Sequence, residues 1–204
     1  MEAFLPPWIQ SAVEAVPPDV GWLFVLAMVV SAGGFWRVHY FVSIGYAFSI
    51  AAMAVACAWI WRGSLDLGLA LQCAALAAYG LRLGTYITRR ETSPAYATEM
   101  EDVRRRGAGV GLPVKLAIWP SVSLLYVLMF LPALLNLLRA ESEPAARPLA
   151  FVLPGLVVMA LGLGMESLAD AQKSAFKAAN PRRFCDVGLY RFVRCPNYLG
   201  ELVF

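Results

Sequence analysis

"VHYFVSIGYAFSIAAMAVACAWIW", residues Val38 to Trp61, contains no Asp, Glu, Lys or Arg. A helix that crosses a bilayer needs about 20 predominantly apolar residues, so this stretch is long enough to span a membrane. Soluble helices keep a polar face, which this stretch lacks. It therefore predicts a transmembrane helix.

Similar stretches recur along the chain and are separated by short segments with Arg, Gly, Pro or acidic residues. The mean hydropathy is +0.63 and charged residues make up 15%, well below the quarter that is typical of soluble domains. We expect an all-α, polytopic transmembrane bundle, formed by residues 1–204 as a single integral-membrane domain. The predicted full spans are Val20–Trp36, Val38–Trp61, Leu65–Ile87, Leu112–Leu138 and Pro148–Leu168, and a sixth begins near Asn197.

The distribution of basic residues predicts the orientation. With the N-terminus outside, the inward segments hold twelve Lys and Arg residues and the outward segments hold three. The positive-inside rule therefore favours an N-terminus outside, a cytoplasmic loop over 89–111 and a cytoplasmic segment over 169–196. The first twenty residues contain no Lys or Arg, which excludes a secretory signal.

The sequence offers few residues or motifs for a metal site, a disulfide or a nucleotide-binding loop. The four cysteines have no C-x-x-C spacing and His39 is the only histidine, so neither a metal site nor a disulfide is predicted. No Gly-rich Rossmann or Walker signature is present. We expect no nucleic-acid partner; the expected partners are membrane lipids and a lipid-like small molecule.

Polar residues form a stripe on the third span. Tyr79, Arg82, Tyr86 and Arg89 follow at spacings of three, four and three, so they share one helix face. The arginines could extend toward the headgroups, as long basic side chains do at span ends. Arg82 lies about two turns inside Arg89, which favours a functional role, because charges inside spans are costly.

A second stripe begins where the fifth span ends. Glu166, Asp170, Lys173 and Lys177 recur at four, three and four residues. One interpretation is an exposed ladder in which Asp170 pairs with Lys173. The alternative is a cytoplasmic pocket in which these side chains and the nearby arginines bind a polyanionic ligand, beside an apolar chamber in the membrane.

The segments "ESLADAQKSAFK" and "RFCDVGLYRFVRCPNYLGE", residues 166–177 and 183–201, resemble the C-terminal signature of the steroid 5α-reductase family. The likeness is closest to the bacterial branch, labelled a domain of unknown function. "RLGTYITRR", residues 82–90, resembles the third span of that family more weakly.

The resemblance implies a seven-helix membrane protein of the bacterial inner membrane, with its cofactor site facing the cytoplasm. It implies an enzyme that uses NADPH to reduce a carbon–carbon double bond conjugated to a ketone, in a steroid or another lipid. Tyr86 corresponds to the tyrosine that hydrogen-bonds the ketone, and Arg89 accompanies it as a catalytic residue. The implied cofactor-binding residues are Glu166, Asp170, Lys173, Lys177, Arg183, Arg194, Asn197, Tyr198 and Glu201.

Three departures from the family pattern are present. Cys195 replaces the usual His of the R-H-P-N-Y motif. The second span has no carboxylate, whereas the steroid enzymes carry a Gln-Glu pair there. We expect Ser43, Tyr46 or Tyr40 of this span to have a role other than that of the Gln-Glu pair. The chain ends at Phe204, so we expect it to be C-terminally incomplete relative to the family.

Two other functions remain open. A membrane methyltransferase that uses S-adenosylmethionine, of the isoprenylcysteine or phospholipid type, resembles the chain in the R-x-P-x-Y-x-G region. The third possibility is a non-catalytic lipid-binding membrane protein. The A-D-x-Q-K and F-C-D-x-G-L motifs favour the reductase.

Overall fold

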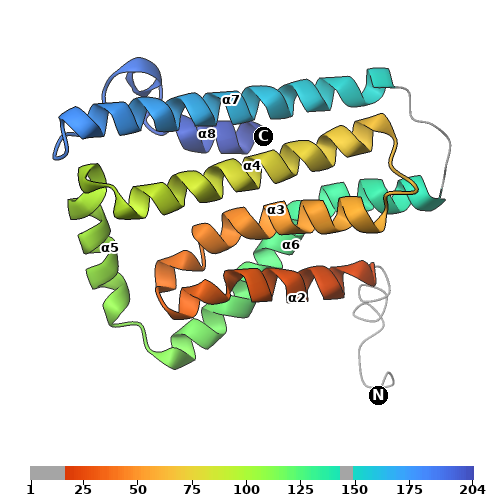
Figure 1. The fold of residues 1–204 in the computed structure, drawn as a ribbon, viewed down its shortest axis with the longest axis horizontal. Coiled ribbons are helices and arrows are strands. Elements are labelled where there is room, and N and C mark those ends of the chain that lie inside the picture. The colour runs from red at the N-terminus through yellow and green to blue at the C-terminus, as the bar shows by residue number, and fades with distance from the viewer. Residues whose placement is uncertain (1–16, 143–148) are drawn as a thin grey trace, which may run out of the picture.

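The computed structural model describes residues 17–142 and 149–204, and within these ranges it contains helices and no strand. Figure 1 shows α2, α3, α4 and α7 side by side in that order, with α6 behind α2 and α3 and with α8 against α7. The α-helices are α2 (Asp19–Ser31), α3 (Ile44–Ile60), α4 (Leu67–Thr92), α5 (Ala97–Ala108), α6 (Leu112–Ser142), α7 (Leu149–Ala179) and α8 (Pro196–Val203). The short 3₁₀ turns are η2 (Ala32–Phe35), η3 (Val38–Tyr40), η4 (Pro94–Tyr96) and η5 (Gly188–Arg191).

The described helices confirm the all-α membrane fold. Four of them are long and apolar enough to cross a membrane: Val38–Ile60, Leu67–Thr92, Leu112–Ser142 and Val152–Ala179. The apolar helix Asp19–Phe35, which covers the first predicted span, is shorter, so a count of five full spans stays a prediction. Pro148, the predicted start of the fifth span, lies outside the described residues.

Small residues let the central helices approach each other closely. A Cβ atom on Gly80 of α4 would lie 2.4 Å from the carbonyl oxygen of Ala47 on α3, too close for any side chain. Without a hydrophobic driving force in lipid, such close backbone packing is a main source of helix association. The buried side chains of Met53 on α3 and of Phe130 and Leu134 on α6 belong to one apolar core that α2, α3, α4 and α6 share.

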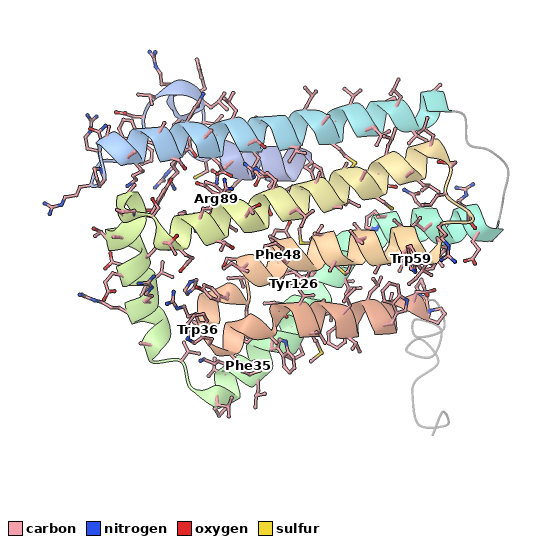
Figure 2. All side chains as sticks on the ribbon, viewed as in Figure 1. Phe35, Trp36, Phe48, Trp59, Arg89 and Tyr126 are labelled. Atoms are coloured by element: carbon pink, nitrogen blue, oxygen red, sulfur yellow. The ribbon has the colours of Figure 1, made fainter. Side chains whose placement is uncertain are left out.

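The outer surface is apolar and carries tryptophans at both ends. Val29 and Leu161 are more than half exposed, at 67% and 64%. Trp36 and Trp59 are exposed at opposite ends of the bundle (Figure 2). Tryptophan concentrates at the two membrane–water interfaces, so this arrangement fits a bilayer-embedded bundle.

One end of the bundle is strongly basic. Helix α5 lies across this end, beside the last turns of α4 and α7 (Figure 1), so residues 89–111 are mostly helical rather than an open loop. Arg62 and Arg139 lie at the other end, and Arg147 is outside the described residues. That the basic end faces the cytoplasm stays a prediction of the positive-inside rule. The residues at this end are Arg37, Arg89, Arg90, Arg104, Arg105, Arg106, Lys173, Lys177, Arg182, Arg183, Arg191 and Arg194.

Candidate functional site

Arg82 of α4 joins two carboxylates of α7 inside the bundle. Its Nη1 lies 2.8 Å from Glu166 Oε1 and its Nη2 lies 2.6 Å from Asp170 Oδ2. Both acids are almost fully buried, and their spacing of four residues puts them on the α7 face that meets α4. Asp170 therefore pairs with Arg82 and not with Lys173, which makes the exposed-ladder interpretation wrong for the two acids.

One oxygen of this cluster has no partner. Glu166 Oε2 is buried and accepts no hydrogen bond within the described residues. Leaving a buried carboxylate oxygen unpaired is costly, and such atoms in native proteins often mark a functional site or an unfilled ligand position. Glu201 of α8 is close enough for its charge to act on Glu166 and on the hydroxyls of Tyr46 and Tyr79.

Two glycines bring α8 directly onto α7. A Cβ atom on Gly162 would lie 2.4 Å from the Phe204 nitrogen, and one on Gly200 would lie 2.6 Å from the Glu166 nitrogen. The backbones of the two helices are therefore in contact, which fixes Glu201 near Glu166 and Asn197 near Lys173 and Lys177. The Phe204 ring stacks on Tyr79 with 4.4 Å between centroids, and this holds α8 against α4.

The predicted catalytic Tyr86 belongs to a chain of hydroxyl groups. Its oxygen lies 3.5 Å from the Tyr96 hydroxyl, which lies 3.2 Å from Ser174 Oγ on α7. The Arg82 guanidinium is 5.7 Å from the centroid of the Tyr86 ring, so Tyr86 adjoins the buried ion-pair cluster. Arg89 is exposed near the end of α4 (Figure 2) and lies outside this hydroxyl chain.

A cavity of about 360 Å³ opens at the basic end, between α7 and the segment that leads into α8. Five of the predicted cofactor-binding residues line it together: Lys173, Lys177, Arg194, Asn197 and Tyr198. A second, more open hollow of about 480 Å³ shares Phe184, Tyr190 and Arg194 with the first. The structure thus brings side chains from two segments of the chain to one place.

Tyr190 lines both hollows and adds an unused donor. Its hydroxyl is buried and has no hydrogen-bond partner within the described residues. Burial, reinforced by the nearby charge of Asp170, raises the pKa of the Tyr190 phenol above its usual range. The phenol therefore stays protonated at neutral pH and can donate to a ligand.

The family-like motifs shape the floor of the cavity. The Leu189 backbone N–H donates to Gln172 Oε1 at 2.9 Å, which ties the loop to α7. Gly188 has φ of +60°, and a Cβ there would lie 2.3 Å from Gln172 Oε1. This position therefore requires glycine. Arg183 pairs with Asp186 at 3.3 Å on the exposed side of the loop and does not line the cavity.

Sequence reasoning assigned several of these residues no role. Arg82 was recognised as a charge inside a span, but its two acidic partners lie more than 80 residues away. Gln172 is part of the A-D-x-Q-K motif, whereas nothing in the sequence marks Glu99, which pairs with Lys177 at 2.5 Å.

Within the described residues no group of three or more His, Cys, Asp or Glu side chains is placed to hold a metal ion.

A second buried acid occupies the same end of the bundle. Glu91 of α4 bonds His39 through Oε1 at 3.0 Å, and Arg37 and Tyr40 through Oε2 at 3.2 and 3.3 Å. Arg104 of α5 lies 3.9 Å from the same carboxylate. Both oxygens are used, so this cluster fastens the α2–α3 connection and α5 to α4.

A family model described as "Protein of unknown function (DUF1295)" matches residues 34–204. Neither a curated protein nor a solved structure gives a significant match to the chain. The matched region covers the ion-pair cluster, the hydroxyl chain and the basic cavity.

Proposed function

We propose, from the premise that this chain belongs to the DUF1295 family of steroid 5α-reductase-like membrane proteins, that it is an NADPH-dependent membrane reductase. Its substrate would be a lipid or steroid-like molecule with a carbon–carbon double bond conjugated to a ketone. The cofactor site would face the cytoplasm from a bacterial inner membrane.

The observation that carries this proposal is the position of a basic cavity beside a buried acidic cluster. Lys173, Lys177 and Arg194 line the cavity, and Asn197 adds an amide that can bond hydroxyl or amide groups. Glu166 and Asp170 lie one or two helical turns deeper on α7. A dinucleotide phosphate needs cations, and its ribose and nicotinamide groups need acceptors and donors, so a basic cavity with acids nearby on the same helix suits such a ligand.

The described residues also pass a test of fit for the cofactor. The cavity and its adjoining hollow lie within the range of small-molecule sites, about 300–1,000 Å³. The Tyr190 hydroxyl lines the cavity and has no partner among the described residues, and a ligand that accepts from it would remove that penalty. Glu166 Oε2 also has no partner among the described residues, but it lies deeper on α7 and is not part of the cavity lining.

The chemistry of the reduction divides between cofactor and protein. NADPH, when bound, supplies the hydride. Tyr86 would donate a hydrogen bond to the ketone oxygen, where negative charge develops as the hydride arrives. Arg82 lies against the Tyr86 ring and holds Glu166 and Asp170 in place, so it is a positioning residue rather than a catalytic one. The apolar bundle would exclude water from the reacting atoms.

Binding measurements on the whole chain in lipid nanodiscs test the proposal. We expect saturable binding of NADPH, and we expect Asn197→Ala and Glu201→Ala each to weaken it about tenfold, as loss of a charged or well-placed polar contact does. Arg62→Gln, at the opposite end of the bundle, is the control and should bind like the parent.

Each alternative predicts a different result. Saturable binding of S-adenosylmethionine without NADPH binding would favour the methyltransferase. Binding of neither cofactor would favour the lipid-binding protein. NADPH affinity that Asn197→Ala and Glu201→Ala leave unchanged would contradict the proposed site.

A further inference from the structure

An internal carboxylate already occupies the basic cavity. Glu99, in the first turn of α5, lines the cavity and places Oε1 2.5 Å from Lys177 Nζ. The same ammonium donates to the Pro181 carbonyl at 3.1 Å. This contact joins α5 to α7 across the cavity.

The two partners of this ion pair are in very different surroundings. The Lys177 side chain is 8% exposed, whereas the Glu99 side chain is 41% exposed. A buried ammonium needs an anion nearby, because it has lost its hydration. A half-exposed carboxylate loses little when it rotates into water. The pair is therefore built so that the anion, and not the cation, can be exchanged.

The other cations of the cavity have no such partner. Among the described residues, Lys173 and Arg194 form no ion pair, although the charge of Lys173 does act on nearby Asp170. One carboxylate thus faces three cations, which leaves a positive excess in the cavity. A phosphate carries more charge and more acceptor oxygens than a carboxylate, so it satisfies the three cations better.

We propose that Glu99 occupies the phosphate position of this cavity and that a phosphate group binds by displacing the Glu99 side chain from Lys177. Glu99 is then an affinity-determining residue that competes with the ligand and keeps Lys177 paired when no ligand is bound. The proposal rests on the proposed function only for the identity of the molecule that carries the phosphate.

A matched pair of variants on α5 tests this displacement. Glu99→Gln removes the competing charge, whereas Glu101→Gln removes an exposed acid that pairs with Arg105 on the same helix. The nanodisc-embedded chain is titrated with inorganic pyrophosphate, and calorimetry measures the binding. Glu99→Gln should bind pyrophosphate about fivefold more tightly than the parent does. That factor corresponds to the loss of a partly exposed ion pair. Glu101→Gln should match the parent.

A third variant separates displacement from a general charge effect. Lys177→Met should weaken pyrophosphate binding more than tenfold. In the Lys177→Met background Glu99→Gln should no longer tighten binding, because the competition takes place at Lys177. If Glu99→Gln binds pyrophosphate no better than Glu101→Gln does, or tightens binding equally without Lys177, the displacement proposal is wrong.

Parallel titrations identify the source of the phosphate. Tightening by Glu99→Gln for both pyrophosphate and NADPH supports this inference and the proposed function together. Tightening for pyrophosphate with no NADPH binding supports the displacement and contradicts the reductase. If phosphatidylglycerol in the nanodisc blocks pyrophosphate while phosphatidylcholine does not, the displacement holds with a lipid headgroup as the ligand.

Discussion

Glu91 and Glu166 are both buried carboxylates paired with arginine, yet their environments differ in one respect. Every oxygen of Glu91 has partners, supplied by His39, Arg37 and Tyr40. Glu166 uses Oε1 for Arg82, and its Oε2 has no partner among the described residues. Glu91 lies under α5 and the α2–α3 connection, whereas Glu166 lies against α8, about two helical turns along α7 from Lys173 of the basic cavity.

The comparison separates two uses of a buried charge. The Glu91 cluster is saturated, because both carboxylate oxygens have partners; such a cluster holds elements together and gains nothing from a ligand. The cluster of Arg82, Glu166 and Asp170 is unsaturated, because Glu166 Oε2 has no partner among the described residues. An unsaturated cluster keeps a free acceptor at a cost in stability, and a ligand that donates to it recovers that cost. The two carboxylates therefore predict different responses to their own replacement: loss of the Glu91 charge should mainly lower stability, and loss of the Glu166 charge should mainly weaken ligand binding.

The largest expected effect comes from removing the shared arginine of the unsaturated cluster. Arg82→Met removes the ion-pair partner that Glu166 and Asp170 share, so we expect a loss of about 3 kcal/mol in unfolding free energy. Arg37→Met is the matched change in the other cluster and should cost at most about 1 kcal/mol, because Glu91 keeps His39, Tyr40 and Arg104. Unfolding of both variants in detergent, followed by circular dichroism, gives the two values. Equal losses would contradict the idea that Glu166 and Asp170 depend on Arg82 more than Glu91 depends on Arg37.

A smaller effect is expected in the loop beside the unsaturated cluster. Gly188 has a left-handed backbone conformation, and a Cβ there would lie against Gln172. Gly188→Ala should therefore lower the unfolding free energy by about 1–2 kcal/mol. Gly107→Ala at the other cluster meets only the end of the Val38 side chain and gains helix propensity, so it should be nearly neutral. Thermal unfolding measures both changes. A neutral Gly188→Ala would mean that the Gln172 contact does not hold the loop.

The sequence predicted the membrane fold and the relative placement of several candidate residues because both depend on helical periodicity. Hydropathy located the long helices, and the four-residue spacing of Glu166 and Asp170 put them correctly on one face of α7. The family resemblance grouped Lys173, Lys177 and Asn197 in one cofactor site, and these three residues line one cavity.

Pairing between distant segments was not predictable in the same way. Arg82 meets its acids where α4 packs against α7, and α8 contacts both helices through Gly162, Gly200 and the Phe204–Tyr79 stack. No local sequence pattern encodes that contact. Residues 89–111 were predicted to be a loop because of their many charges. They form η4 and α5 because Met100 is buried and Arg104 reaches Glu91.

The most direct test of the account is NADPH binding to Glu166→Gln and Glu91→Gln, measured by calorimetry on the whole chain in nanodiscs. Glu166→Gln replaces the unpaired acceptor by an amide donor and should weaken NADPH binding about tenfold. Glu91→Gln should bind within twofold of the parent, at about 1–2 kcal/mol lower stability, through the loss of charged hydrogen bonds. An equal change in affinity for the two variants, or a parent protein that does not bind NADPH, would contradict the account.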